Sequence, residues 1–132
     1  MSPQSRPLSP HLQVYRPMYT MVLSILHRAS GVFQSLGLVL LVYWLVAAAS
    51  GAEAYATAAR VFSSPLVKLA VAGWVVAFWF HLFAGLRHLV WDAGFGFEKR
   101  TARRSGQLIV VLAALASLFT LALAWRHLGG GA

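Results

Sequence analysis

The chain has 132 residues, of which 59% are hydrophobic and 11% are charged, and it contains no cysteine. Ordinary soluble domains have a charged share of roughly 25%, so this composition argues against a water-soluble globule. Three Asp and Glu residues in total leave little material for a hydrolase with paired carboxylates or for a carboxylate metal site. The lack of cysteine excludes disulfides, thiol catalysis and a thiolate-held iron–sulfur cluster within this chain.

Three long segments contain no Asp, Glu, Lys or Arg. They have 24, 18 and 21 residues and lie between Arg28 and Glu53, Lys68 and Arg87, and Arg104 and Arg126. A bilayer core of about 30 Å needs about 20 apolar residues in a helix. We therefore predict an all-α membrane protein, a single membrane-anchor domain over residues 1–132 within a heteromeric helical bundle. Its three transmembrane helices are predicted near Met21–Ala49, Pro65–Trp91 and Ser105–Trp125.

Two connections separate the predicted helices. Gly51–Ser64 is expected to be a short outer loop, whose alanine-rich part can form a partial turn of helix. Asp92–Arg104 is expected to be the inner loop, with Gly94 and Gly96 as helix breakers. The first twenty residues lack the apolar core of a signal peptide, so we expect the first apolar run to stay in the mature protein.

Basic residues are unevenly divided between the two sides of the predicted bundle. The side of the N-terminus and the inner loop has eight: Arg6, Arg16, Arg28, Arg87, Lys99, Arg100, Arg103 and Arg104. The other side has three: Arg60, Lys68 and Arg126. By the positive-inside rule we expect a cytoplasmic N-terminus. The net charge of +8 then reflects topology and contact with membrane lipid, and we expect no nucleic-acid partner.

Polar residues at membrane depth form two stripes. Ser24, His27, Arg28 and Gly31 follow the spacing i, i+3, i+4 and i+7, so they share one face of the first helix. His81, Gly85 and His88 follow the spacing i, i+4 and i+7 on the second helix. Because ionisable groups are expensive in lipid, residues of this kind are functional candidates.

His81 has the position expected of a haem ligand. Counting about 1.5 Å per residue from the inner boundary, it lies roughly 15 Å deep. Gly85, one turn later on the same face, leaves room for a flat macrocycle, whose propionates would point toward His27, Arg28 or His88. Low-spin iron needs a second axial ligand, and no other histidine of the chain is clearly at this depth. We therefore expect another subunit to supply it.

Each of these residues also has an ordinary structural interpretation. His81 could form an interhelical hydrogen bond without binding metal, and the glycines could serve helix packing alone. The Ser24 hydroxyl could bond its own helix, and Arg28 could extend to the headgroups. His88 could be an ordinary interfacial residue.

Two ordered motifs resemble a known family. The first consists of Arg6-Pro7-Leu8-Ser9-Pro10-His11-Leu12-Gln13-Val14-Tyr15 followed by Ser24-Ile25-Leu26-His27-Arg28-Ala29-Ser30-Gly31. The second is His81-x3-Gly85-x-Arg87-His88-x3-Asp92-x-Gly94. Both are similar to signatures of succinate dehydrogenase cytochrome b subunits, the larger membrane anchors of respiratory complex II. The resemblance covers about residues 6 to 125, and Ser30 stands where the family often has threonine.

The resemblance implies a four-subunit complex. A flavoprotein with FAD would oxidise succinate, a subunit with iron–sulfur clusters would relay electrons, and two small membrane subunits would present ubiquinone. His81 would be an axial ligand of haem b, opposed by a histidine of the second small anchor subunit. His27, Arg28 and His88 would lie near the propionates, and Ser24 and Arg28 would line the quinone site. Asp92 would more readily pair with Arg87 or the inner loop than carry protons.

Two alternatives remain at this point. The chain could anchor a quinol:fumarate reductase, because the sequence does not decide the direction of the reaction, or it could be a haem-free membrane scaffold. In the main interpretation we expect a multi-pass protein of the bacterial inner membrane that is inactive alone, because it lacks the machinery that oxidises succinate. A small transporter would require an inverted repeat or a broken helix, and the sequence indicates neither.

Overall fold

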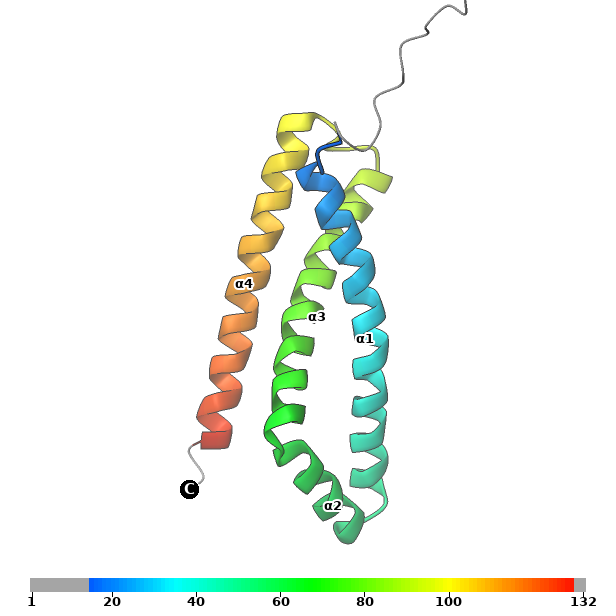
Figure 1. Ribbon diagram of the computed structural model, residues 1–132, viewed down its shortest axis with the longest axis vertical. Helices are drawn as coiled ribbons and strands as arrows, with labels where there is room; N and C mark the ends of the chain where they lie inside the picture. The colour runs from blue at the N-terminus through cyan, green and yellow to red at the C-terminus, as the bar shows by residue number, and fades with distance from the viewer. Residues whose placement is uncertain (1–14, 130–132) are drawn as a thin grey trace, which may run out of the picture.

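A computed structural model describes residues 15–129, which form four helices and no strand. They are α1 (Tyr19–Ala49), α2 (Ala52–Ser63), α3 (Pro65–Asp92) and α4 (Lys99–Gly129). Figure 1 shows α1, α3 and α4 as long helices running alongside one another, with the short α2 joining α1 to α3 at one end of the bundle. The start of α1 and the α3–α4 connection lie together at the opposite end. The predicted all-α fold is therefore confirmed.

Three of these helices, α1, α3 and α4, are long and apolar enough to cross a membrane. Large apolar side chains stay exposed along them, among them Leu36, Leu69 and Leu118. Such an apolar exterior suits lipid and neighbouring membrane helices. The helix α4 begins at Lys99, six residues before the predicted start at Ser105. Its first turns carry basic side chains. These lie outside the charge-free run on which the predicted start was based, but lysine and arginine are favourable in a helix.

The segment expected to be an outer loop is a helix, so this expectation was wrong. The helix α2 has 12 residues and begins directly after Gly51, whose φ is 106°. Its interior is rich in alanine and free of glycine and proline, which favours a helix. Ala58 is fully buried while most of its neighbours are exposed, so α2 is a short amphipathic helix packed on the ends of α1 and α3.

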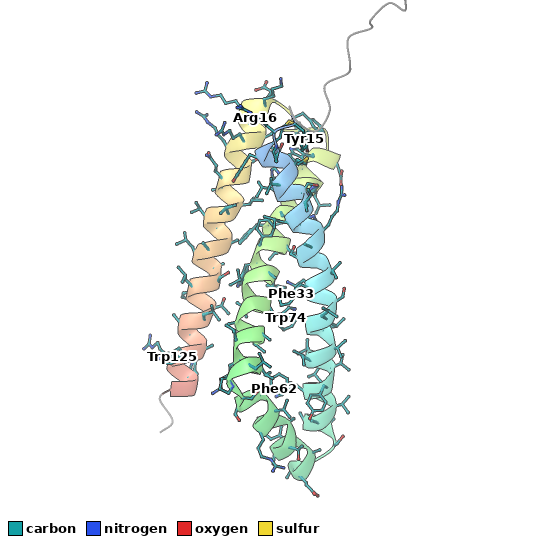
Figure 2. The ribbon with its side chains drawn as sticks, in the orientation of Figure 1. Tyr15, Arg16, Phe33, Phe62, Trp74 and Trp125 are labelled. Atoms are coloured by element: carbon teal, nitrogen blue, oxygen red, sulfur yellow. The ribbon has the colours of Figure 1, made fainter. Side chains whose placement is uncertain are left out.

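The helix α3 lies between α1 and α4 and packs against both. Leu23, Ala84 and Ile109, one from each long helix, form the buried core cluster. Gly37 allows the Trp74 side chain to lie directly against α1, because a Cβ at this position would overlap the indole. Figure 2 shows Trp74 lying between α1 and α3. Trp74 is thus a packing residue at the α1–α3 interface.

The α3–α4 connection turns at two glycines, as predicted. Gly94 and Gly96 have φ values of 89° and 82°, a region that residues with a Cβ rarely adopt. Asp92 is the last residue of α3 and Lys99 the first of α4. Because the turn is short, the end of α3 and the start of α4 are held side by side.

Candidate functional site

Three histidine rings from two helices form a continuous stack at the α1–α3 interface. The ring of His27 on α1 lies between His81 and His88 of α3, with ring centroids 4.3 Å from His81 and 4.7 Å from His88. The interplanar angles are 23° and 17°. Residues seven apart on a helix are separated by about 10.5 Å along its axis, so α3 leaves a gap of one ring thickness, which His27 fills.

Two glycines make this stack possible. A Cβ at Gly85 on α3 would lie 3.7 Å from His27 Nε2, and a Cβ at Gly31 on α1 would lie 3.0 Å from His81 Cε1. Each helix therefore presents a glycine to a histidine of the other. The space beside Gly85 was expected to admit a macrocycle, and in the structure the nearest group there is the His27 ring.

The His81 ring is held through Nδ1. This atom lies 3.1 Å from the backbone oxygen of His27 and 3.1 Å from Ser30 Oγ. The Ser30 hydroxyl donates its own proton to the His27 oxygen, at 2.8 Å. Both oxygens can therefore only accept from Nδ1, which fixes the proton of the neutral ring on that nitrogen. Within residues 15–129, His81 Nε2 has no hydrogen-bond partner and is not enclosed by the chain.

The Nε2 atom of His27 differs from that of His81, because the chain encloses it. This nitrogen is buried and has no hydrogen-bond partner among residues 15–129. A buried polar atom without a partner is costly, so such an atom marks a place where a water or a bound group completes the structure. His88 is fixed by its own helix, since its Nδ1 lies 2.7 Å from the backbone oxygen of Ala84.

The structure does not bring every predicted site residue into the histidine stack. Ser24 is half-buried and Arg28 exposed on the same helix as His27. Neither side chain forms a hydrogen bond to another described residue. Arg6 and His11 of the first motif lie outside the described residues.

Arg87 is buried between the end of α3 and the start of α4, with 6% of its surface exposed. Its Nε donates to Ser105 Oγ at 2.9 Å, and its Nη2 donates to the backbone oxygen of Ala102 at 2.8 Å. The guanidinium also lies 3.8 Å from the centre of the Trp91 ring. The hydrogen bonds found for Arg87 among the described residues go to serine and backbone oxygens, and none goes to Asp92. The rings of Trp91 and His88 in turn meet in a T-shaped arrangement, with ring centroids 5.2 Å apart.

Three side chains that matter here were not singled out from the sequence as site residues. Ser30 follows His27 by three positions, which is the helical spacing that places it beside the same partner helix. Gln34 Nε2 and Trp74 Nε1 are buried donors without a hydrogen-bond partner among residues 15–129. Gln34 carried a signal, because it is a polar residue in an otherwise apolar run; the burial of Trp74 depends on contact with α1, which spacing does not specify.

The sequence matches, over residues 2–120, the family described as succinate dehydrogenase/fumarate reductase transmembrane subunit. This chain belongs to that family. It is 43% identical over 117 residues to the succinate dehydrogenase cytochrome b556 subunit of Paracoccus denitrificans, covering 89% of this chain and 90% of the relative. The cytochrome b560 subunit of Reclinomonas americana is 36% identical over 126 residues, with 92% and 85% coverage. The mitochondrial cytochrome b560 subunit of Sus scrofa is 31% identical over 116 residues, with 86% and 69% coverage.

Membership of the succinate dehydrogenase/fumarate reductase transmembrane family confirms the resemblance stated from the two motifs. With three apolar helices of membrane-spanning length, the chain is a multi-pass membrane subunit of an enzyme complex. The histidine stack lies within α1 and α3, two of those spans.

Proposed function

We propose that this chain is the cytochrome b anchor subunit of a succinate:quinone oxidoreductase, in which His81 is one axial ligand of haem b. The observation that carries the proposal is the state of the His81 ring. Two oxygens hold the proton on Nδ1, so the lone pair resides on Nε2, the atom that has no partner in the described chain. Ligand histidines of metal sites commonly have this arrangement. The cytochrome b556 and b560 names of the relatives support it.

The residues around His81 fit such a group. The iron would be held by His81 Nε2, and we propose that His27, Arg28 and His88 are in the vicinity of the propionates. When bound, a haem of this kind supplies one-electron transfer. His27 and His88 cannot be the opposing ligand, because the His27 ring lies face to face against His81 and His88 lies beyond it. The second ligand would therefore come from the other small anchor subunit.

We also propose that Ser24 and Arg28 contribute to a ubiquinone-reduction site near the start of α1. A hydroxyl donor and a fixed cation stabilise the negative charge that develops on a quinone oxygen as electrons arrive. Arg28 is exposed and free to contact a bound molecule or a partner subunit. In the proposed complex, a flavoprotein with FAD and an iron–sulfur subunit oxidise succinate and deliver the electrons. The chain alone would then be inactive.

The arrangement of charge supports a cytoplasmic N-terminus in a bacterial inner membrane. Figure 2 shows Arg16 at the end of the bundle where α3 turns into α4. Lys99, Arg100, Arg103 and Arg104 begin α4 at that end. Arg87 is buried there and contributes little to the surface charge. The exposed basic residues still outnumber those at the opposite end, as the positive-inside rule requires of the cytoplasmic side.

Two alternatives have observations in their favour. The family description includes fumarate reductase, so the complex could run in the opposite direction. The hydrogen bonds of His81 Nδ1 to α1 would also suit a haem-free scaffold, in which this histidine only joins two helices.

A visible difference spectrum tests the haem assignment. The complex is purified from native membranes through a tag on this chain, and the dithionite-reduced spectrum is compared with the air-oxidised one. We expect a low-spin b-type α-band that disappears in His81→Ala and persists in His127→Ala, a control at the exposed end of α4. A wild-type complex that contains flavin and iron–sulfur clusters but lacks the band would refute the assignment.

A further inference from the structure

We propose that Ser30 is a positioning residue that sets the electron-donating strength of His81 toward the haem iron. The inference rests on the proposed function, because it takes His81 as the ligand. It concerns a serine with 8% of its surface exposed, whose oxygen stands between an α1 carbonyl and an α3 imidazole.

The geometry forms a small closed network. Ser30 Oγ donates to the His27 oxygen at 2.8 Å, and His81 Nδ1 lies 3.1 Å from each of these two oxygens. The single hydroxyl proton is thus committed to the carbonyl, and the lone pairs of Oγ face Nδ1. The Nδ1 proton is shared between two acceptors, one of which is the hydroxyl of the buried Ser30.

This network acts on the ligand through its far nitrogen. A hydrogen bond that Nδ1–H donates increases electron density on the ring and the basicity of Nε2. A more basic ligand favours the ferric over the ferrous iron and so lowers the midpoint potential. Removing the Ser30 oxygen leaves Nδ1 with one acceptor in place of two, so we expect the midpoint potential of the haem to rise.

A second buried serine bonds its own helix but does not contact a histidine ring. Ser117 on α4 has 3% of its surface exposed and donates to the backbone oxygen of Ala113 at 2.6 Å. It resembles Ser30 in burial and in its bond to its own helix, and no hydrogen bond connects it to a histidine ring. Ser117→Ala is therefore the matched control for the loss of a buried helix-bonded hydroxyl.

The test is a redox titration of the purified complex, followed at the haem α-band, together with the low-spin electron paramagnetic resonance spectrum. We expect Ser30→Ala to keep a low-spin haem with a raised midpoint potential and shifted g-values. Ser30→Thr should restore both, because a helical threonine can make the same bond to the preceding turn. Ser117→Ala should match the wild type.

The result separates this inference from the haem assignment. A haem that is present in Ser30→Ala with an unchanged or lowered potential overturns the role of Ser30 and leaves His81 as ligand. A potential that rises equally in Ser117→Ala overturns it too, because the effect then belongs to general loosening of the bundle. A wild-type complex without haem, or a haem unaffected by His81→Ala, refutes the proposed function itself.

Discussion

Gly31 faces the imidazole of His81 so closely that a single added carbon would touch the ring, at 3.0 Å from Cε1. The reciprocal contact, His27 against Gly85, has more room, with a distance of 3.7 Å. The two glycines therefore differ in how much they constrain the site. Gly31 sets the orientation of the proposed ligand, whereas Gly85 mainly allows the two helices to interlock.

This difference predicts the effect of Gly31→Ala. The added methyl pushes the His81 ring away from Ser30, and overpacking of this kind costs about 1–3 kcal/mol. We expect haem retention to weaken about tenfold, since 1.4 kcal/mol corresponds to a factor of ten. The ratio of haem to flavin in the purified complex measures it. Gly73→Ala is the control, because its Cβ would meet Phe33 at an ordinary 3.9 Å; equal haem losses in the two variants would contradict the prediction.

The quinone assignment predicts a separation of two activities. Ser24→Ala and Arg28→Leu remove the hydroxyl donor and the cation proposed to stabilise the reduced quinone oxygen. We expect ubiquinone reduction by the complex to fall about 100- to 1,000-fold, as when one donor to a developing oxyanion is lost. Succinate oxidation with an artificial acceptor should be nearly unchanged, because it bypasses the membrane subunits. Unimpaired quinone reduction in both variants would remove Ser24 and Arg28 from the site.

The contact between Gly37 and Trp74 predicts a non-additive effect on stability. Gly37→Ala forces the indole out of its place between α1 and α3, which should lower the thermal unfolding midpoint of the complex. Trp74→Leu alone removes buried aromatic surface and should also destabilise. Because the leucine leaves room for the alanine methyl, the double variant should be more stable than the sum of the two effects. Strict additivity in a thermal melt would show that the two residues are not coupled.

The sequence predicted more of the helices than of the contacts between them. Charge-free runs of membrane length specify where α1, α3 and α4 lie, because lipid excludes ionisable groups from such runs. Such runs do not indicate α2, because its alanine-rich sequence favours a helix but is not apolar enough to span a membrane. Helical spacing placed His27 on one stripe and His81 on another, but the insertion of His27 between His81 and His88 depends on the relative shift of two helices. No periodicity within either helix encodes that shift. The contact of Ser30 with His81 depends on the same shift. For this reason the sequence showed Ser30 only as part of a motif and indicated no function for it.

The burial of Arg87 predicts that neither a neutral nor a lysine substitute will replace it. Its guanidinium donates to Ser105 and Ala102 while covering the face of Trp91, so one planar group ties the ends of α3 and α4 together. Lysine has a compact ammonium that cannot make this set of contacts at once. We expect Arg87→Lys and Arg87→Ala both to reduce the amount of assembled complex in membranes several-fold. Ser105→Ala should have a smaller effect, about 1 kcal/mol, because it removes one hydrogen bond and leaves the other.

The readout for Arg87 is the flavin that co-purifies with this chain, with Arg103→Lys as the control. Arg103 is exposed on the first turns of α4, so the exchange should leave assembly unchanged. Because Trp91 also meets His88, loosening the Arg87 contact should broaden the low-spin resonance of whatever haem remains in Arg87→Lys. Wild-type amounts of complex in Arg87→Lys would show that charge alone, independent of the geometry of the guanidinium, is what this position requires.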